Sequence, residues 1–132
     1  MRSRHFRLPP RLEGKPAEEA GKLAEKRFLS ICEDARSQGK FPEWLLFVER
    51  ATSEEDHEGV DVWAHTDVGR IPLQIKRSSL QRTRFLSREN RKHIPCIVVA
   101  PGMRVSIIFQ FALSQLSQKR KEIQRKKETA LV

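Results

Sequence analysis

The chain has 132 residues, which suits a single domain with a modest core. Its formal net charge of +9 favours a polyanionic partner such as nucleic acid, although ribosome and membrane-surface binders can carry the same charge. No apolar run is long enough to cross a bilayer and no secretory leader is visible, so we expect a cytoplasmic protein with no membrane contact. Cys32 and Cys96 stand alone and are expected to be buried thiols, and no metal-binding spacing joins the histidines.

The first third of the chain predicts a basic arm, a helix and a strand. Residues 1–15 hold five basic side chains against one acidic one and contain two prolines, so we expect a flexible basic arm that contacts phosphates or only aids solubility. From Pro16 to about Ser37, apolar residues recur at helical spacing, which predicts a helix with Pro16 in its first turn. The apolar run between Phe41 and Ala51 suits a buried strand.

An acidic stretch follows in an otherwise basic chain. Residues 49–61 hold six acidic side chains against one basic one. The simpler interpretation is a solvated acidic loop, and it is favoured for Glu54 and Glu55. The alternative is that some of these acids crowd a cation site and strengthen its field.

The centre of the chain predicts a β-hairpin. Val60–Ala64 and Ile71–Lys76 both alternate between apolar and polar residues, and turn-forming residues lie between them. We expect the apolar faces to turn toward the core, with Val60 on the same face as Val62 and Ala64.

This hairpin places three functional side chains on its other face, namely Asp61, Gln74 and Lys76. The carboxylate of Asp61 and the amide oxygen of Gln74 suit a hard divalent cation. Lys76 can orient a water molecule or stabilise negative charge that develops on a phosphate. The alternative interpretation is an ordinary solvated hairpin face with a weak cross-strand ion pair.

The last part of the chain predicts a basic segment, a strand and a helix. Residues 76–92 carry a net charge of +6, which favours contact with nucleic acid over a merely solvated surface. Ile94–Ala100 predicts a central buried strand, and Val105–Phe109 is either a last strand or the start of a helix that runs on to Ala130. We expect residues 117–132 to be a basic, solvated helix end. The predicted phosphate contacts are Arg77, Ser78, Arg82, Arg84, Arg88, Arg91 and Lys92.

Three short motifs resemble those of the PD-(D/E)XK nuclease superfamily. Gly59-Val60-Asp61-Val62 followed by Leu73-Gln74-Ile75-Lys76 is most similar to the Mrr-type restriction endonuclease branch, in which Gln-x-Lys replaces Glu-x-Lys. Gly21-Lys22-Leu23-Ala24-Glu25 is similar to the first helix of archaeal Holliday junction resolvases. The proline of the superfamily's name is absent before Asp61, where Val60 stands, and many members lack it too.

The resemblance implies a role for each matching residue. Asp61, Glu25, Gln74 and the backbone carbonyl of Ile75 would hold Mg²⁺, for which Mn²⁺ would substitute, and Lys76 would complete the catalytic set. Glu18 is the second choice for the ligand from the helix. Because the Gln74 amide is neutral, it would bind a cation more weakly than the usual carboxylate.

The order of the expected elements agrees with the motif. It predicts a single α/β domain over residues 1–132, a restriction endonuclease-like sandwich with a mixed central sheet flanked by helices. The expected activity is a Mg²⁺-dependent endodeoxyribonuclease that hydrolyses DNA phosphodiester bonds, with branched DNA such as junctions as a candidate substrate. A homodimer would be needed to cut both strands. The alternative is a non-catalytic basic nucleic-acid-binding protein on the same fold.

Overall fold

The computed structural model describes residues 10–87 and 94–130, with the backbone alone for residues 10–18 and 20. A helix leads into three antiparallel strands, a short helix lies between the first and second of them, and a fourth strand follows the third helix. In chain order the elements are α1 (Pro10–Ser37), β1 (Leu45–Arg50), α2 (Ser53–His57), β2 (Val62–Thr66), β3 (Gly69–Lys76), α3 (Ser79–Leu86), β4 (Cys96–Val98) and α4 (Val105–Ala130).

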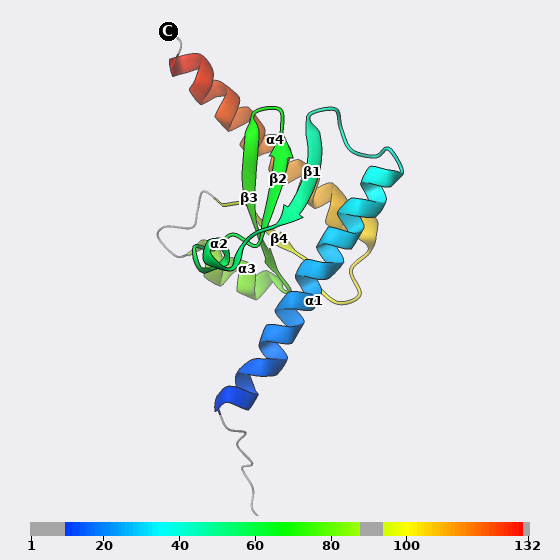
Figure 1. Ribbon diagram of the computed structural model, residues 1–132, viewed down its shortest axis with the longest axis vertical. Helices are drawn as coiled ribbons and strands as arrows, with labels where there is room; N and C mark the ends of the chain where they lie inside the picture. The colour runs from blue at the N-terminus through cyan, green and yellow to red at the C-terminus, as the bar shows by residue number, and fades with distance from the viewer. Residues whose placement is uncertain (1–9, 88–93, 131–132) are drawn as a thin grey trace, which may run out of the picture.

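The four strands form one mixed sheet in the order β1-β2-β3-β4. β2 pairs antiparallel with both β1 and β3, whereas β3 and β4 are parallel. α1 and α4 pack on one face of the sheet, and α2 and α3 lie beside the other face at the lower end of β3 (Figure 1). The chain is therefore an α/β protein with a mixed sheet flanked by helices, as the element order predicts.

Two apolar clusters hold these layers together. The main cluster joins the inward side chains of the sheet, such as Leu73 and Ile75, to Phe28 of α1 and Ile108 of α4. Full burial of each such side chain stabilises the fold by roughly 1.5–3 kcal/mol. The smaller cluster lies under α3 on the opposite face, and it consists of Val60, Phe85, Ile94 and Cys96.

The smaller cluster corrects one prediction about the hairpin. Val60 lies there and does not share the face of Val62 and Ala64, which belong to the main cluster. The chain enters β2 through Gly59, whose φ of 95° only glycine adopts readily, and regular strand alternation begins at Val62. Asp61 therefore lies just outside the strand, next to the strand end.

The predicted basic arm is wrong for residues 10–15, because α1 begins at Pro10. Proline is well suited to the first turn of a helix, where its missing N–H would be unpaired in any case. Pro16 then lies inside the helix and removes one of its hydrogen bonds. Residues 1–9 of the predicted arm lie outside the described residues.

The strand predicted as central is at the edge of the described sheet. β4 has three residues and pairs only with β3, yet Cys96 and Ile97 are both buried because α3 and α4 cover its two faces. The strand predicted as buried, β1, forms the other edge and leaves Leu46 exposed. Helices on both faces give an edge strand the apolar sequence of a central one.

The last element is helical from its start, so the alternative of a final strand at residues 105–109 is wrong. The predicted basic helix end continues to Ala130, and residues 131–132 lie outside the described residues. One of its arginines is not simply solvated, since Arg120 donates two hydrogen bonds to the Asp67 carboxylate at 2.8 and 2.7 Å. This pair fastens α4 to the β2–β3 turn. Among the described residues, no helix is long and apolar enough to cross a membrane.

Candidate metal centre

A cavity of about 630 Å³ opens where β1 and β3 end and β2 begins. α1 forms one wall, the short helix α2 and the residues before it form the second, and α3 forms the third. A backbone hydrogen bond of 2.9 Å from the Asp61 N–H to the Leu73 carbonyl joins the segment before β2 to β3. The cavity therefore gathers residues that lie far apart in the sequence.

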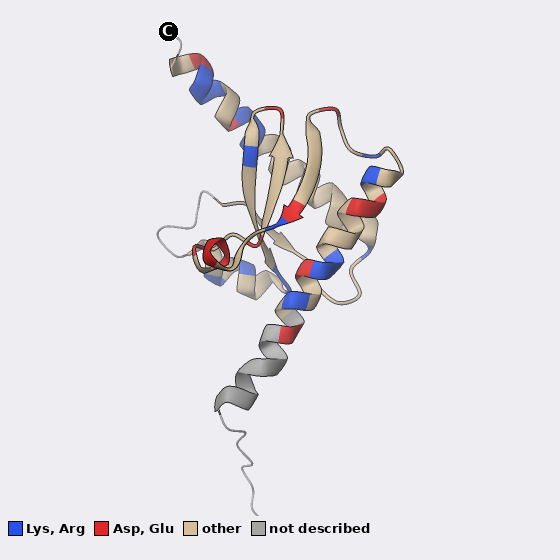
Figure 2. Cartoon of the chain, viewed as in Figure 1, with Lys and Arg blue, Asp and Glu red and all other residues tan. Residues whose placement is uncertain are grey.

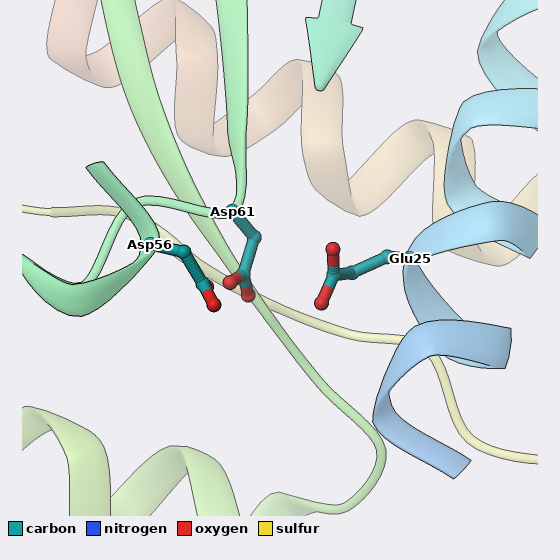
Figure 3. A group of neighbouring side chains, drawn as sticks. All are labelled: Glu25, Asp56 and Asp61. Atoms are coloured by element: carbon teal, nitrogen blue, oxygen red, sulfur yellow. The ribbon is translucent and has the colours of Figure 1, made fainter. Parts of the chain in front are cut away.

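Three carboxylates meet in this cavity, and each comes from a different part of the fold. Glu25 projects from α1, Asp56 from α2, and Asp61 from the segment before β2 (Figure 3). One carboxylate oxygen of each lies within 4.8 Å of one oxygen of each of the others. Like charges at this separation repel one another unless a proton or a cation compensates them.

Asp61 is the most buried of the three, with 4% of its surface exposed. Its Oδ2 accepts a hydrogen bond of 2.8 Å from the backbone N–H of Ile75. Burial, with the neighbouring Asp56 carboxyl adding to it, raises the pKa of Asp61 to about 8, although the Ile75 N–H acts in the opposite direction. Without a cation, this carboxyl therefore holds a proton at neutral pH for most of the time.

Glu25 is shifted in the same direction. Partial burial raises the pKa of Glu25, and the nearby Asp56 raises it further. The positive charges of Arg50, Lys22 and Lys76 act against this rise. Any additional positive charge between Glu25 and Asp61 would therefore stabilise the charged form of Glu25.

Gln74 also lines the cavity, and its side chain offers a further oxygen donor. Only 7% of the residue is exposed, and its buried Oε1 has no hydrogen-bond partner among the described residues. Burying an acceptor without a partner costs about 1–3 kcal/mol. Oxygen donors of this kind, together with carboxylates, are what Mg²⁺ and Mn²⁺ prefer, so the residues present fit a hard divalent cation.

Basic side chains surround the acidic centre. Figure 2 shows basic residues of α3 beside the acidic helix α2, and further basic residues on α1 across the same end of the sheet. Lys76 projects from the same strand as Gln74, and its Nζ lies 5.4 Å from the centre of the Phe85 ring. The basic residues that line the cavity are Lys22, Arg50, Lys76, Arg77 and Arg84.

Most of the predicted site residues meet in this cavity. It is lined by the four predicted metal ligands and by the predicted catalytic lysine, together with two of the predicted phosphate contacts. These residues are Glu25, Asp61, Gln74, Ile75, Lys76, Arg77 and Arg84. The side chain of Glu18, the second choice for the helix ligand, lies outside the described residues.

The other predicted phosphate contacts are not part of the cavity lining. Ser78 caps α3, where its hydroxyl accepts a hydrogen bond from the Gln81 N–H. Arg82 donates through Nε to the Cys96 carbonyl at 2.9 Å, and its guanidinium lies over the Phe111 ring. Both side chains are therefore engaged within the fold. The remaining three predictions, Arg88, Arg91 and Lys92, lie outside the described residues.

Sequence reasoning left open that acids of residues 49–61 crowd a cation site, but it did not single out Asp56, because it expected a loop where the structure has α2. Thr52 and Glu55 form a capping box, in which the Thr52 hydroxyl accepts from the Glu55 N–H and the Glu55 carboxylate accepts from the Thr52 N–H. The pattern Thr-x-x-Glu is a known signal for the start of a helix. With that signal, the start of α2 could have been anticipated, although not which of its acids faces Asp61.

Comparisons with protein-family models, with curated proteins and with solved structures found no match for this chain. The functional argument therefore depends on the chemistry of the cavity itself. Its parts are three carboxylates, one unpaired amide oxygen, a lysine on the same strand as that amide, and a rim of basic side chains.

Proposed function

We propose that this protein is a Mg²⁺-dependent endodeoxyribonuclease with a restriction endonuclease-like fold. The observation that carries the proposal is that Gln74, whose buried Oε1 has no partner among the described residues, lines the same cavity as Asp61 and Lys76. An unpaired acceptor beside an acid is unfavourable in the free protein and becomes favourable when a cation binds both. Structural ion pairing does not explain it, because no basic side chain pairs with Asp61 among the described residues.

Asp61, Glu25, the side chain of Gln74 and the carbonyl of Ile75 would hold the cation. When bound, Mg²⁺ supplies a Lewis acid that polarises a phosphate and makes water a better nucleophile. Lys76 lines the same cavity, where its ammonium group would orient the attacking water or balance the charge that develops on the phosphate.

The basic rim supports a polyanionic substrate. Lys22 lies on the α1 wall and Arg77 and Arg84 lie at the α3 wall, so a phosphate backbone that crosses the cavity meets positive charge on both sides. Binding should weaken as salt rises, because each phosphate contact releases counterions. Branched DNA such as a four-way junction is a candidate substrate alongside ordinary duplex DNA, and a second copy of the chain would cut the second strand.

The test is cleavage of supercoiled plasmid and of a four-way junction with Mg²⁺ or Mn²⁺. The native protein should nick or cut at least one substrate, and chelation of the metal should stop the reaction. Asp61→Ala and Lys76→Ala should both lose cleavage by a factor of at least about 100. Lys40→Ala is the matched control, because Lys40 is exposed beyond the far end of α1.

DNA binding separates the nuclease from its main alternative. Lys76→Ala should retain most binding, measured by fluorescence anisotropy at two salt concentrations. Equal cutting by the native protein and by Lys76→Ala would refute the mechanism. Tight, salt-sensitive binding without any cutting would instead identify a non-catalytic nucleic-acid-binding protein on the same fold.

A further inference from the structure

Asp56 is the one carboxylate in the cavity to which the proposed nuclease assigns no task. It lies on α2, which has only five residues, and it is exposed where Asp61 is buried. Figure 3 shows its carboxylate pointing to Asp61, on the side opposite to Glu25. The Asp56 side chain is thus directed toward the acidic centre even though solvent is available to it.

The surrounding residues fix α2 in this position. The capping box of Thr52 and Glu55 closes its first turn. The Glu55 carboxylate also lies 3.6 Å from Arg70, and the Arg70 guanidinium stacks on the Trp63 ring at 3.9 Å. The short helix is therefore tied to the outer face of β2 and β3, and Asp56 projects from a supported position.

No ion pair compensates the acidic cluster among the described residues. None of the three carboxylates lies within ion-pair distance of a basic side chain in the part of the chain that the structure describes. The unpaired Oε1 of Gln74, on a residue that is 93% buried, lines the same cavity. A hard divalent cation bound in this cavity would neutralise the acidic cluster and would also give the buried Gln74 acceptor a partner.

We propose that Asp56 is a further metal ligand, so that α2 supplies a third carboxylate to the cation site. This inference rests on the proposed function only in sharing its metal site, and it goes beyond the ligands that the resemblance implies. Affinity for hard cations rises with the number of charged ligands, so loss of Asp56 should weaken binding substantially. Because the residue is exposed, the substitution Asp56→Asn should leave the fold intact.

The test is direct binding of Mn²⁺ to the native protein and to Asp56→Asn, measured by calorimetry and by the spin-resonance signal of free Mn²⁺. Glu54→Gln is the matched control, since Glu54 is an exposed acid on the same helix. We expect Asp56→Asn to weaken Mn²⁺ binding at least about tenfold and Glu54→Gln to bind like the native protein. Thermal unfolding without metal checks that all three proteins are folded.

The outcomes distinguish this inference from the proposed nuclease. Native Mn²⁺ affinity in Asp56→Asn, together with loss of binding in Asp61→Asn, would overturn the role of Asp56 and leave the nuclease site standing. Equal weakening by Glu54→Gln would also overturn it, because the effect would then come from the general charge of α2. Absence of Mn²⁺ binding by the native protein would refute both proposals.

Discussion

The buried carboxyl of Asp61 should make the metal-free protein less stable as the pH rises. Its pKa is about 8 in the folded protein against an ordinary value of 3.8, so the folded state binds the proton more tightly than the unfolded state. A group shifted in this direction contributes stability that is complete below about pH 4 and is lost as the pH rises toward 8. The substitution Asp61→Asn removes the titration while retaining an oxygen that can accept from the Ile75 N–H.

The size of the effect follows from the shift. Linkage with these two pKa values gives a difference of about 4 kcal/mol between pH 5 and pH 8, at 1.36 kcal/mol for each unit. Glu25, whose pKa is raised as well, shares the cluster and takes part of the proton, which reduces the expected value to about 2 kcal/mol. For a domain of this length that corresponds to roughly 6–10 °C in Tm.

The assay is urea unfolding followed by tryptophan fluorescence, at pH 5 and at pH 8, in the presence of a chelator. The native protein should lose about 2 kcal/mol relative to Asp61→Asn over this interval. Asp34→Asn is the control, because Asp34 is an exposed acid on α1 outside the cavity. Parallel pH profiles for the native protein and Asp61→Asn would show that Asp61 titrates normally, and the argument for a strained acidic centre would fail.

Three further substitutions test the site and the fold. Gln74→Leu removes the buried acceptor that lacks a partner, so it should stabilise the metal-free protein by about 1 kcal/mol in urea unfolding. The same substitution should weaken Mn²⁺ binding in calorimetry. A loss of stability would mean that the amide has a partner. Arg27→Met removes charged hydrogen bonds to the carbonyls of Ala100 and Met103 and should lower the free energy of unfolding by about 1.5–3 kcal/mol, whereas Lys26→Met, at an exposed neighbouring position, should change it little. Leu73→Ala leaves a cavity in the main cluster and should cost about 2–5 kcal/mol by the same measurement, so a cost under about 1 kcal/mol would contradict its place in the core.

The fold was predictable where local patterns and burial agree. The hairpin of β2 and β3 has clear alternation and a turn between its strands, and α1 has an apolar stripe at helical spacing. Sequence patterns could not place β4 at the edge, because burial by helices on both faces makes an edge strand as apolar as a central one. They also could not show where α1 begins, since Pro10 and Pro16 both suit a first turn.

Sequence patterns predicted the site residues that lie close together in the chain, but not the carboxylate that a separate short helix adds to them. The spacing of Gln74 and Lys76 places both on one face of a strand, and the structure brings them to the cavity that Asp61 and Glu25 also line. Asp56 could not be chosen from the other acids of its stretch by composition, because its direction depends on a helix of five residues. Ser78 and Arg82 had the right chemistry for phosphate, but capping and packing engage them elsewhere.

The way α1 is fastened has a consequence for the order of folding. Arg27 donates to the Ala100 carbonyl across 73 residues of sequence, and to the Met103 carbonyl beyond it. The antiparallel hairpin of β2 and β3 is local and can form early, whereas the Arg27 hydrogen bonds must close most of the chain into a loop. Glu25 joins Asp61 only when α1 packs on the sheet, so the cation site needs both the helix and the hairpin in place.

A cation that needs both carboxylates can then recognise only the nearly complete structure. Interactions that are absent from the folding transition state slow unfolding and leave the folding rate almost unchanged. Stopped-flow measurements with and without Mg²⁺ should accordingly show slower unfolding and an unaltered refolding rate. During synthesis the cation site would therefore remain incomplete until α1 can pack on the sheet.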